Sequence, residues 1–150
     1  TGSNIDSVDH SNNGGAFVTN NLTEFLETFR DAQYEDWGMS YNQVKEGMYH
    51  FKSTYFPPYL LDGGTIYESA CGNGLNLFMT LEILQETHDI ENIFVYGNDP
   101  QVGQVNQAST IFDHVAPARG RKGNICAAAS SDLSFVPSNA FDLVFTGYIR

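Results

Sequence analysis

The sequence has little positive charge. Only seven Lys and Arg face 18 Asp and Glu, which gives a formal net charge of −11 at pH 7. Between Lys52 and Arg119 there is no Lys or Arg at all. A phosphate-binding loop of the Gly-x-x-x-x-Gly-Lys type needs a lysine, so this stretch cannot contain such a loop. Proteins that bind nucleic-acid phosphates usually present a basic face, so we predict no nucleic-acid partner.

Cysteines, long apolar runs and metal-ligand patterns are also scarce. The two cysteines, Cys71 and Cys126, fall in strand-like contexts, which favours buried free thiols over a disulfide. No apolar run approaches the ~20 residues that span a bilayer, so we predict no membrane partner. The histidines lack metal-ligand spacing, so we predict no metal. The chain starts at Thr1 without a visible signal peptide, so we expect a cytoplasmic protein whose N-terminus is trimmed.

The most informative stretch begins at Thr65. β-Branched and aromatic residues there predict a short strand that ends at Glu68, and Gly72 and Gly74 then predict a tight turn. The apolar spacing that follows predicts a helix, with one face made of Leu77, Phe78, Leu81 and Leu84. A strand, a glycine turn and a helix in this order bring backbone N–H groups and a positive helix end towards a ligand.

Strand and helix patterns then alternate. We predict strands at 65–70, 93–98, about 124–128 and 141–146, and helices at about 73–87 and 101–113. This alternation predicts an α/β fold whose mainly parallel sheet carries helices on both faces. Ligands of such sheets bind beyond the carboxyl ends of the strands, where Glu68 and Asp99 fall.

The residues before the first strand divide into two segments. Residues 1–20 are rich in Ser, Asn, Asp and Gly, so we expect a flexible N-terminal segment. Residues 21–62 carry two helix patterns, the second of which begins with the capping-box pair Ser40 and Gln43. Its predicted apolar stripe is Tyr41, Val44, Met48, Phe51 and Tyr55. We expect this segment to form a helical cap over a core of residues 63–150.

The motifs resemble those of the class I S-adenosylmethionine-dependent methyltransferases. Residues 68–74, Glu-Ser-Ala-Cys-Gly-Asn-Gly, resemble the family's motif I, an acidic residue followed by x-Gly-x-Gly-x-Gly, with Ala70 in place of the first glycine. Residues 95–99 resemble the second strand, which ends in an acid. Residues 133–135 and 141–145 resemble a loop and the fourth strand. The resemblance covers roughly residues 63–149.

The resemblance implies a Rossmann-like fold and S-adenosyl-L-methionine as the cofactor. Glu68 would orient the methionine end and Asp99 would hold the ribose hydroxyls. The full implied cofactor site is Glu68, Ala70, Cys71, Gly72, Asn73, Gly74, Asp99, Pro100, Ser130, Ser131, Asp132, Thr146 and Gly147. Trp37, Tyr41 and Tyr148 are candidates for the substrate pocket. The family continues with further strands after the fourth, so we expect the core to be incomplete and its C-terminal strands to be missing.

The predicted function is methyl transfer to a nitrogen, sulfur or oxygen atom of a small-molecule acceptor, with a homodimer as one assembly. No residue is assigned as a catalytic base. An NAD(P)-binding oxidoreductase is an alternative, although Leu77 stands where its Gly-x-Gly-x-x-Gly motif has a third glycine. A non-catalytic cofactor-binding module is another. Simpler roles also remain open: a helix-capping carboxylate for Glu68, an Asp-Pro turn for Asp99 and Pro100, and packing for the aromatic residues.

Overall fold

The computed structural model describes residues 24, 27, 28, 30, 31, 34, 37–60, 64–114, 121–129, 136 and 139–146. The predicted flexible segment 1–20 lies outside this part of the chain. The elements in order are α3 (Tyr41–Tyr55), the 3₁₀ helix η2 (Pro57–Tyr59), β1 (Thr65–Ser69), α4 (Leu75–His88), β2 (Phe94–Asp99), α5 (Val102–His114), β3 (Arg121–Ala127) and β4 (Leu143–Thr146). The predicted alternation is therefore confirmed, although β3 begins before the predicted residue 124.

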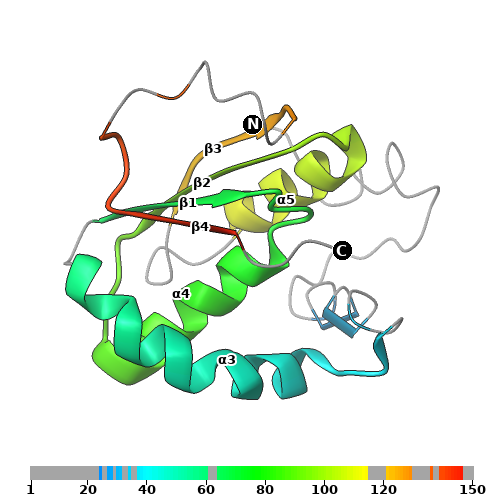
Figure 1. Cartoon of the computed structure of the whole chain (residues 1–150). Helices are drawn as coiled ribbons and strands as arrows, with labels where there is room; N and C mark the ends of the chain where they lie inside the picture. Colours follow the sequence, from blue (N-terminus) through cyan, green and yellow to red (C-terminus); the bar gives the residue numbers. More distant parts are fainter. Residues whose placement is uncertain are drawn as a thin grey trace.

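The four strands form one parallel sheet in the order β3-β2-β1-β4 (Figure 1). From β1 the chain proceeds outwards to β2 and β3, and it then returns to place β4 on the other side of β1. The chain direction therefore reverses between β1 and β4, which makes their carboxyl ends the switch point of the sheet. This arrangement confirms the predicted Rossmann-like α/β class.

Helices α4 and α5 cover the sheet face that carries Ile66, Val95 and Ile125. These three residues belong to one apolar core together with residues of both helices. Along α4 every residue from Leu77 to Leu84 is buried, because the sheet lies on one side of this helix and α3 on the other. Figure 1 shows α3 beneath α4, on the side away from the sheet. Closure of the predicted cap over the strand ends stays a prediction.

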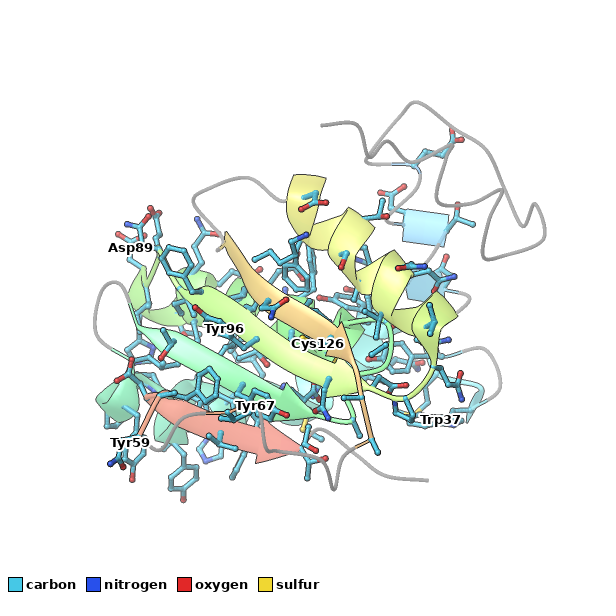
Figure 2. The ribbon with its side chains drawn as sticks, turned by 90° about the horizontal axis from the view of Figure 1, so that it is seen from above. Trp37, Tyr59, Tyr67, Asp89, Tyr96 and Cys126 are labelled. Atoms are coloured by element: carbon cyan, nitrogen blue, oxygen red, sulfur yellow. The ribbon has the colours of Figure 1, made fainter. Side chains whose placement is uncertain are left out.

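The opposite face of the sheet differs from the prediction of helices on both faces. Within the described residues it carries no helix, and Figure 2 shows Tyr67, Tyr96 and Cys126 on it. Phe141 packs there, with its ring centroid 5.0 Å from those of both tyrosines, beside a cavity of about 280 Å³. The reason is geometric: two successive right-handed crossovers in the same direction place α4 and α5 on the same face.

Helix α3 begins with the predicted capping box, in which Ser40 and Gln43 exchange hydrogen bonds. The predicted stripe is only partly buried: Tyr41 and Val44 pack against the core, whereas Met48, Phe51 and Tyr55 are exposed. The other buried residue of the helix is a lysine, Lys52. Apolar periodicity missed it because such a pattern treats every lysine as solvent-exposed, whereas a lysine with polar partners can be buried.

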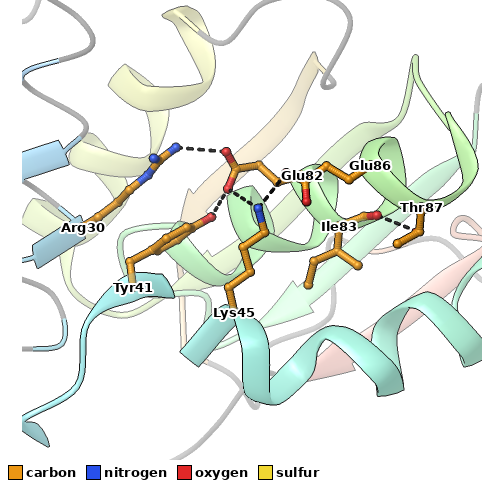
Figure 3. A network of polar contacts seen from close by, with 7 residues as sticks. All are labelled: Arg30, Tyr41, Lys45, Glu82, Ile83, Glu86 and Thr87. Carbon is orange, nitrogen blue, oxygen red and sulfur yellow. Dashed lines mark hydrogen bonds and ion pairs between the residues drawn. The ribbon is translucent and has the colours of Figure 1, made fainter. Parts of the chain in front are cut away.

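A polar network fastens α3 and the helical residue Arg30 to α4 (Figure 3). At its centre, Glu82 accepts a hydrogen bond from the Tyr41 hydroxyl and forms ion pairs with Arg30 at 3.2 Å and Lys45 at 3.5 Å. Lys45 also pairs with Glu86 at 2.8 Å. The first of the two helix patterns predicted in residues 21–62 is described only at residues 24, 27, 28, 30, 31 and 34.

None of the described helices is both long and apolar enough to span a bilayer. The cytoplasmic location stays a prediction.

Candidate functional site

The predicted glycine turn joins β1 to α4 at the switch point. Gly72 and Gly74 have φ angles of +56° and +81°, a left-handed conformation that favours glycine. A Cβ atom at Gly74 would lie 3.0 Å from the Phe112 ring and 3.1 Å from the Ala108 Cβ. Gly74 therefore also permits α5 to approach. At Gly72 the nearest atom would be the Gln104 side-chain oxygen at 3.5 Å, so the backbone angle and not space requires glycine.

Ala70 opens the turn with a φ of +56°. It occupies the position where the resembled motif has its first glycine, and the same left-handed conformation explains that preference. An alanine in this conformation brings its Cβ too close to the neighbouring carbonyl oxygen, which costs roughly 1–2 kcal/mol. The departure from the motif thus keeps the shape of the turn at the expense of local strain.

Asn73 and Cys71 hold the turn from inside. The Asn73 side chain is buried, and its oxygen accepts the Leu75 N–H at 3.2 Å, at the start of α4. Cys71 donates its backbone N–H to the Asn98 carbonyl at 2.9 Å, and Gly97 leaves room for its sulfur. Cys71 is a free, buried cysteine, and burial raises the pKa of its thiol, which favours the neutral form.

Asp99 ties the end of β2 to the same turn. Its Oδ2 accepts the Gly72 N–H at 2.9 Å and its Oδ1 accepts the Gln101 N–H at 3.0 Å. The second bond is the Asp-Pro turn that the sequence suggested, with Pro100 exposed between the two residues. A carboxylate has about four acceptor positions, so these bonds leave capacity for a ribose hydroxyl. The ribose contact stays a prediction.

Glu68 is 2% exposed and its Oε2 accepts a hydrogen bond from the Asn76 side-chain amide at 2.8 Å. A buried carboxylate needs a polar partner, and the Asn76 amide supplies one. Asn76 lies in the first turn of α4, directly after the glycine turn. Its side-chain oxygen accepts from the Lys52 ammonium at 3.0 Å. Lys52, which the sequence analysis did not assign to the site, is thus linked to Glu68.

Lys52 is 3% exposed and also donates to the Thr80 hydroxyl at 2.6 Å. Its ammonium lies 5.4 Å from the Phe145 ring centre and 5.8 Å from that of Phe56, so both aromatic faces surround the charge. Burial lowers the pKa of Lys52 to about 8, and the Glu68 carboxylate opposes that shift. The one signal in the sequence was its spacing from Tyr41 and Phe56, which places all three on one helical face.

Asn98 is a second residue that sequence reasoning passed over. It is fully buried, and its side chain accepts a hydrogen bond from the Tyr67 hydroxyl at 2.6 Å. It donates to the backbone carbonyls of Ala128 and Ala129 at 3.3 and 3.0 Å. Asn98 therefore fixes the chain just before the predicted cofactor residues Ser130, Ser131 and Asp132.

The remaining predicted site residues fall into two groups. Ser130, Ser131, Asp132, Gly147 and Tyr148 lie outside the described residues. Thr146 is described and exposed, and its hydroxyl donates to the Ser69 carbonyl at 3.2 Å, which joins the carboxyl ends of β1 and β4.

The predicted substrate residues Trp37 and Tyr41 lie in different environments. Trp37 is 37% exposed, and Figure 2 shows it at the end of the molecule towards which the strands point. Tyr41 is 3% exposed with its hydroxyl on Glu82, which gives it a packing role in this structure. Substrate contact by either residue stays a prediction.

Among the residues that the structure describes, no group of three or more His, Cys, Asp or Glu is placed to hold a metal ion.

The assembled site is a glycine turn between two carboxylates, Glu68 and Asp99, with the buried Lys52 linked to Glu68 through Asn76.

Neither a family model nor a curated protein matches this sequence. Among solved structures, the chain is similar to a putative class I S-adenosylmethionine-dependent methyltransferase from Listeria monocytogenes, with 15% identity and a TM-score of 0.48 over 71% of this chain and 32% of that one. It is also similar to the methyltransferase subunit of a type I restriction-modification system from Streptococcus thermophilus, with 17% identity and a TM-score of 0.47 over 69% of this chain and 21% of that one.

A third similar structure is a complex between the Haloferax volcanii Trm112 methyltransferase activator and a putative methyltransferase, with 16% identity and a TM-score of 0.43 over 87% of this chain and 48% of that one. This chain thus spans between a fifth and a half of the length of these three structures. The likeness is one of fold alone.

The partner prediction needs correction. We predicted a small-molecule acceptor without nucleic acid, yet the similar structures include a restriction-modification methyltransferase subunit and a complex with a protein activator. The exclusion of nucleic acid from net charge is therefore wrong. The physical reason is that a net charge of −11 is a sum over the chain and does not report how charge is distributed on any one surface.

Proposed function

We propose that this chain forms the cofactor-binding part of an S-adenosylmethionine-dependent methyltransferase. The observation that carries the proposal is the position of two carboxylates around one left-handed glycine turn at the switch point. Asp99 contacts the turn directly through the Gly72 N–H at 2.9 Å. Glu68 lies near the carboxyl end of the neighbouring strand β1, and Asn76, which follows the turn, donates to it.

The chemistry of this edge suits the proposed cofactor. S-adenosylmethionine carries a sulfonium and an ammonium group and no phosphate, so two nearby carboxylates favour it. A nicotinamide dinucleotide would bring an anionic pyrophosphate to the same edge. Leu77, fully buried in α4, also occupies the position of the third glycine that close dinucleotide packing uses.

When bound, the cofactor would supply an electrophilic methyl group, which a nucleophile attacks in line with the leaving thioether. The residues of this chain would hold and orient the cofactor: Asp99 through the ribose hydroxyls, Glu68 through the amino group, and the Gly72 backbone by close approach. Such catalysis depends mainly on alignment. No described residue is assigned as a base. The acceptor is to be found by methyl-transfer assays that offer DNA, RNA, protein and small molecules in parallel.

The first test is calorimetric titration with S-adenosylhomocysteine and, separately, NADH. We expect S-adenosylhomocysteine to bind more tightly. Asp99→Ala should weaken its binding by about 1–3 kcal/mol, the usual scale for hydrogen bonds to a charged group. Asp113→Ala is the matched control. Asp113 lies on α5 and forms an ion pair with Lys122 of β3 at 2.9 Å, so this substitution should leave the affinity unchanged. Tighter binding of NADH, or binding of neither ligand, would overturn the proposal.

Asp99 is a better target here than Gly72. A valine at Gly72 would have to adopt a φ near +56°, which is strained for a β-branched residue, so lost binding in Gly72→Val would also follow from a distorted turn.

A further inference from the structure

We propose that Lys52 is a positioning residue for the cofactor's amino-acid end, and that it acts on Glu68 through the side-chain amide of Asn76. This inference rests on the proposed function and extends it to a residue of α3. The three side chains form a continuous chain of hydrogen bonds, from Lys52 Nζ to Asn76 Oδ1 at 3.0 Å and from Asn76 Nδ2 to Glu68 Oε2 at 2.8 Å.

The direction of these hydrogen bonds follows from the chemistry of the two ends. An ammonium group has only donors and a carboxylate only acceptors, so the amide between them has a single satisfactory orientation. Its oxygen must face Lys52 and its NH₂ must face Glu68. Without Lys52, the Asn76 oxygen would lose this donor and Glu68 would hold the amide from one side only. Lys52 thereby stabilises the orientation in which Asn76 donates to Glu68.

The burial of the two charged groups makes that orientation firm. Lys52 is 3% exposed and Glu68 is 2% exposed, so little water competes for their hydrogen bonds. The Thr80 hydroxyl fixes the ammonium from a second side, at 2.6 Å, and itself donates to the Asn76 backbone carbonyl at 2.9 Å. The Glu68 carboxylate also favours the charged form of Lys52, which keeps the ammonium available as a donor to Asn76.

The functional consequence concerns one part of the cofactor only. Glu68 is the carboxylate assigned to the methionine amino group, so a misoriented Glu68 should weaken ligands that carry this group. Ligands that consist of the nucleoside alone should be unaffected, because Asp99 and the Gly72 turn, which are assigned to the nucleoside, have no hydrogen bond to Lys52 or Asn76 among the described contacts.

The experiment therefore compares two ligands on the same variants. S-adenosylhomocysteine carries the amino-acid end, and 5′-methylthioadenosine lacks it. We expect Lys52→Met to weaken S-adenosylhomocysteine about 10-fold in calorimetry and to change 5′-methylthioadenosine less than 2-fold. Lys45→Met is the matched control from the same helix. Lys45 pairs with Glu82 and Glu86 instead, so neither affinity should change.

A second variant keeps the test decisive if Lys52→Met does not fold. Asn76→Leu removes the amide but leaves the lysine, and it should produce the same selective loss of S-adenosylhomocysteine. Equal weakening of both ligands, or no weakening of either, would overturn the role of Lys52 while leaving the proposed function intact. Failure of the unmodified chain to bind either ligand would instead overturn the proposed function.

Discussion

Two buried carboxylates connect α3 to the rest of the molecule, and their surroundings differ. Glu82 lies on α4 and is enclosed by groups that bind it directly, namely Arg30, Lys45 and the Tyr41 hydroxyl (Figure 3). Glu68 lies at the carboxyl end of β1, beside the glycine turn, and its lysine acts through the amide of Asn76. One carboxylate belongs to the helix layer and the other to the edge of the sheet where ligands bind.

The difference separates a packing role from a binding role. Direct pairing with two cations and a hydroxyl compensates the charge of Glu82 within the helix layer. At Glu68 the Lys52 ammonium donates to the Asn76 oxygen, and the Asn76 amide donates to the carboxylate beside the turn. Substitutions at the first site should therefore change stability without affecting binding, and those around the second should change binding selectively.

The largest expected effect is on stability, at Glu82. Glu82→Ala leaves the buried Tyr41 hydroxyl and two largely buried cations without their common partner, so the free energy of unfolding should fall by about 3 kcal/mol. Urea denaturation measures this change. Glu86→Ala is the control, because its carboxylate is 48% exposed and its ion pair should contribute less than about 1 kcal/mol. Weaker cofactor binding by folded Glu82→Ala protein would contradict the separation of roles.

The next effect is a pH dependence of stability caused by Lys52. Its pKa is lowered to about 8 in the folded protein, whereas an unfolded lysine has its ordinary value of 10.5. Between these values the unfolded state binds more protons, so the contribution of Lys52 to stability rises as the pH increases. The full change is on the order of 3 kcal/mol, because each pH unit that separates the folded from the unfolded pKa corresponds to about 1.4 kcal/mol.

The measurement is the difference in unfolding free energy between wild type and Lys52→Met from pH 7 to pH 10.5. Burial also raises the pKa of Tyr41 and of Cys71, but both groups are present in both proteins, so their effects cancel. We expect wild type to gain stability relative to the variant as the pH rises. A constant difference would show that Lys52 is not buried as a charge.

The smallest expected effect is a gain in stability at Ala70. Because its φ is +56°, Ala70→Gly should relieve backbone strain and raise the free energy of unfolding by about 0.5–1 kcal/mol. Ala108→Gly is the control: Ala108 lies inside α5, where the same substitution should lower stability by about 1 kcal/mol. Thermal unfolding of the two variants should therefore shift in opposite directions, and a shift of both to lower temperature would exclude strain at Ala70.

Local patterns predicted the elements of the site better than its contacts. Glycines at positions 72 and 74 indicated the turn, and the position of Asp99 at a strand end indicated its proximity to that turn. The roles of Asn98 and Lys52 were not predictable in the same way. Each depends on partners far along the chain, such as Tyr67 for Asn98 and Asn76 for Lys52, and one-dimensional periodicity carries no information on such pairs.

The sequence by itself determined the order of strands and helices, the capping box of α3, and a left-handed turn at Gly72 and Gly74, because these features depend on neighbouring residues. Only the tertiary structure decided which face of α3 is buried and which side of the sheet carries the helices. It also decided that Glu82 receives ion pairs from Arg30 and Lys45. Those outcomes depend on contacts between distant segments. A lysine such as Lys52 is buried only where the hydrogen bonds from its partners offset the free-energy cost of its desolvation.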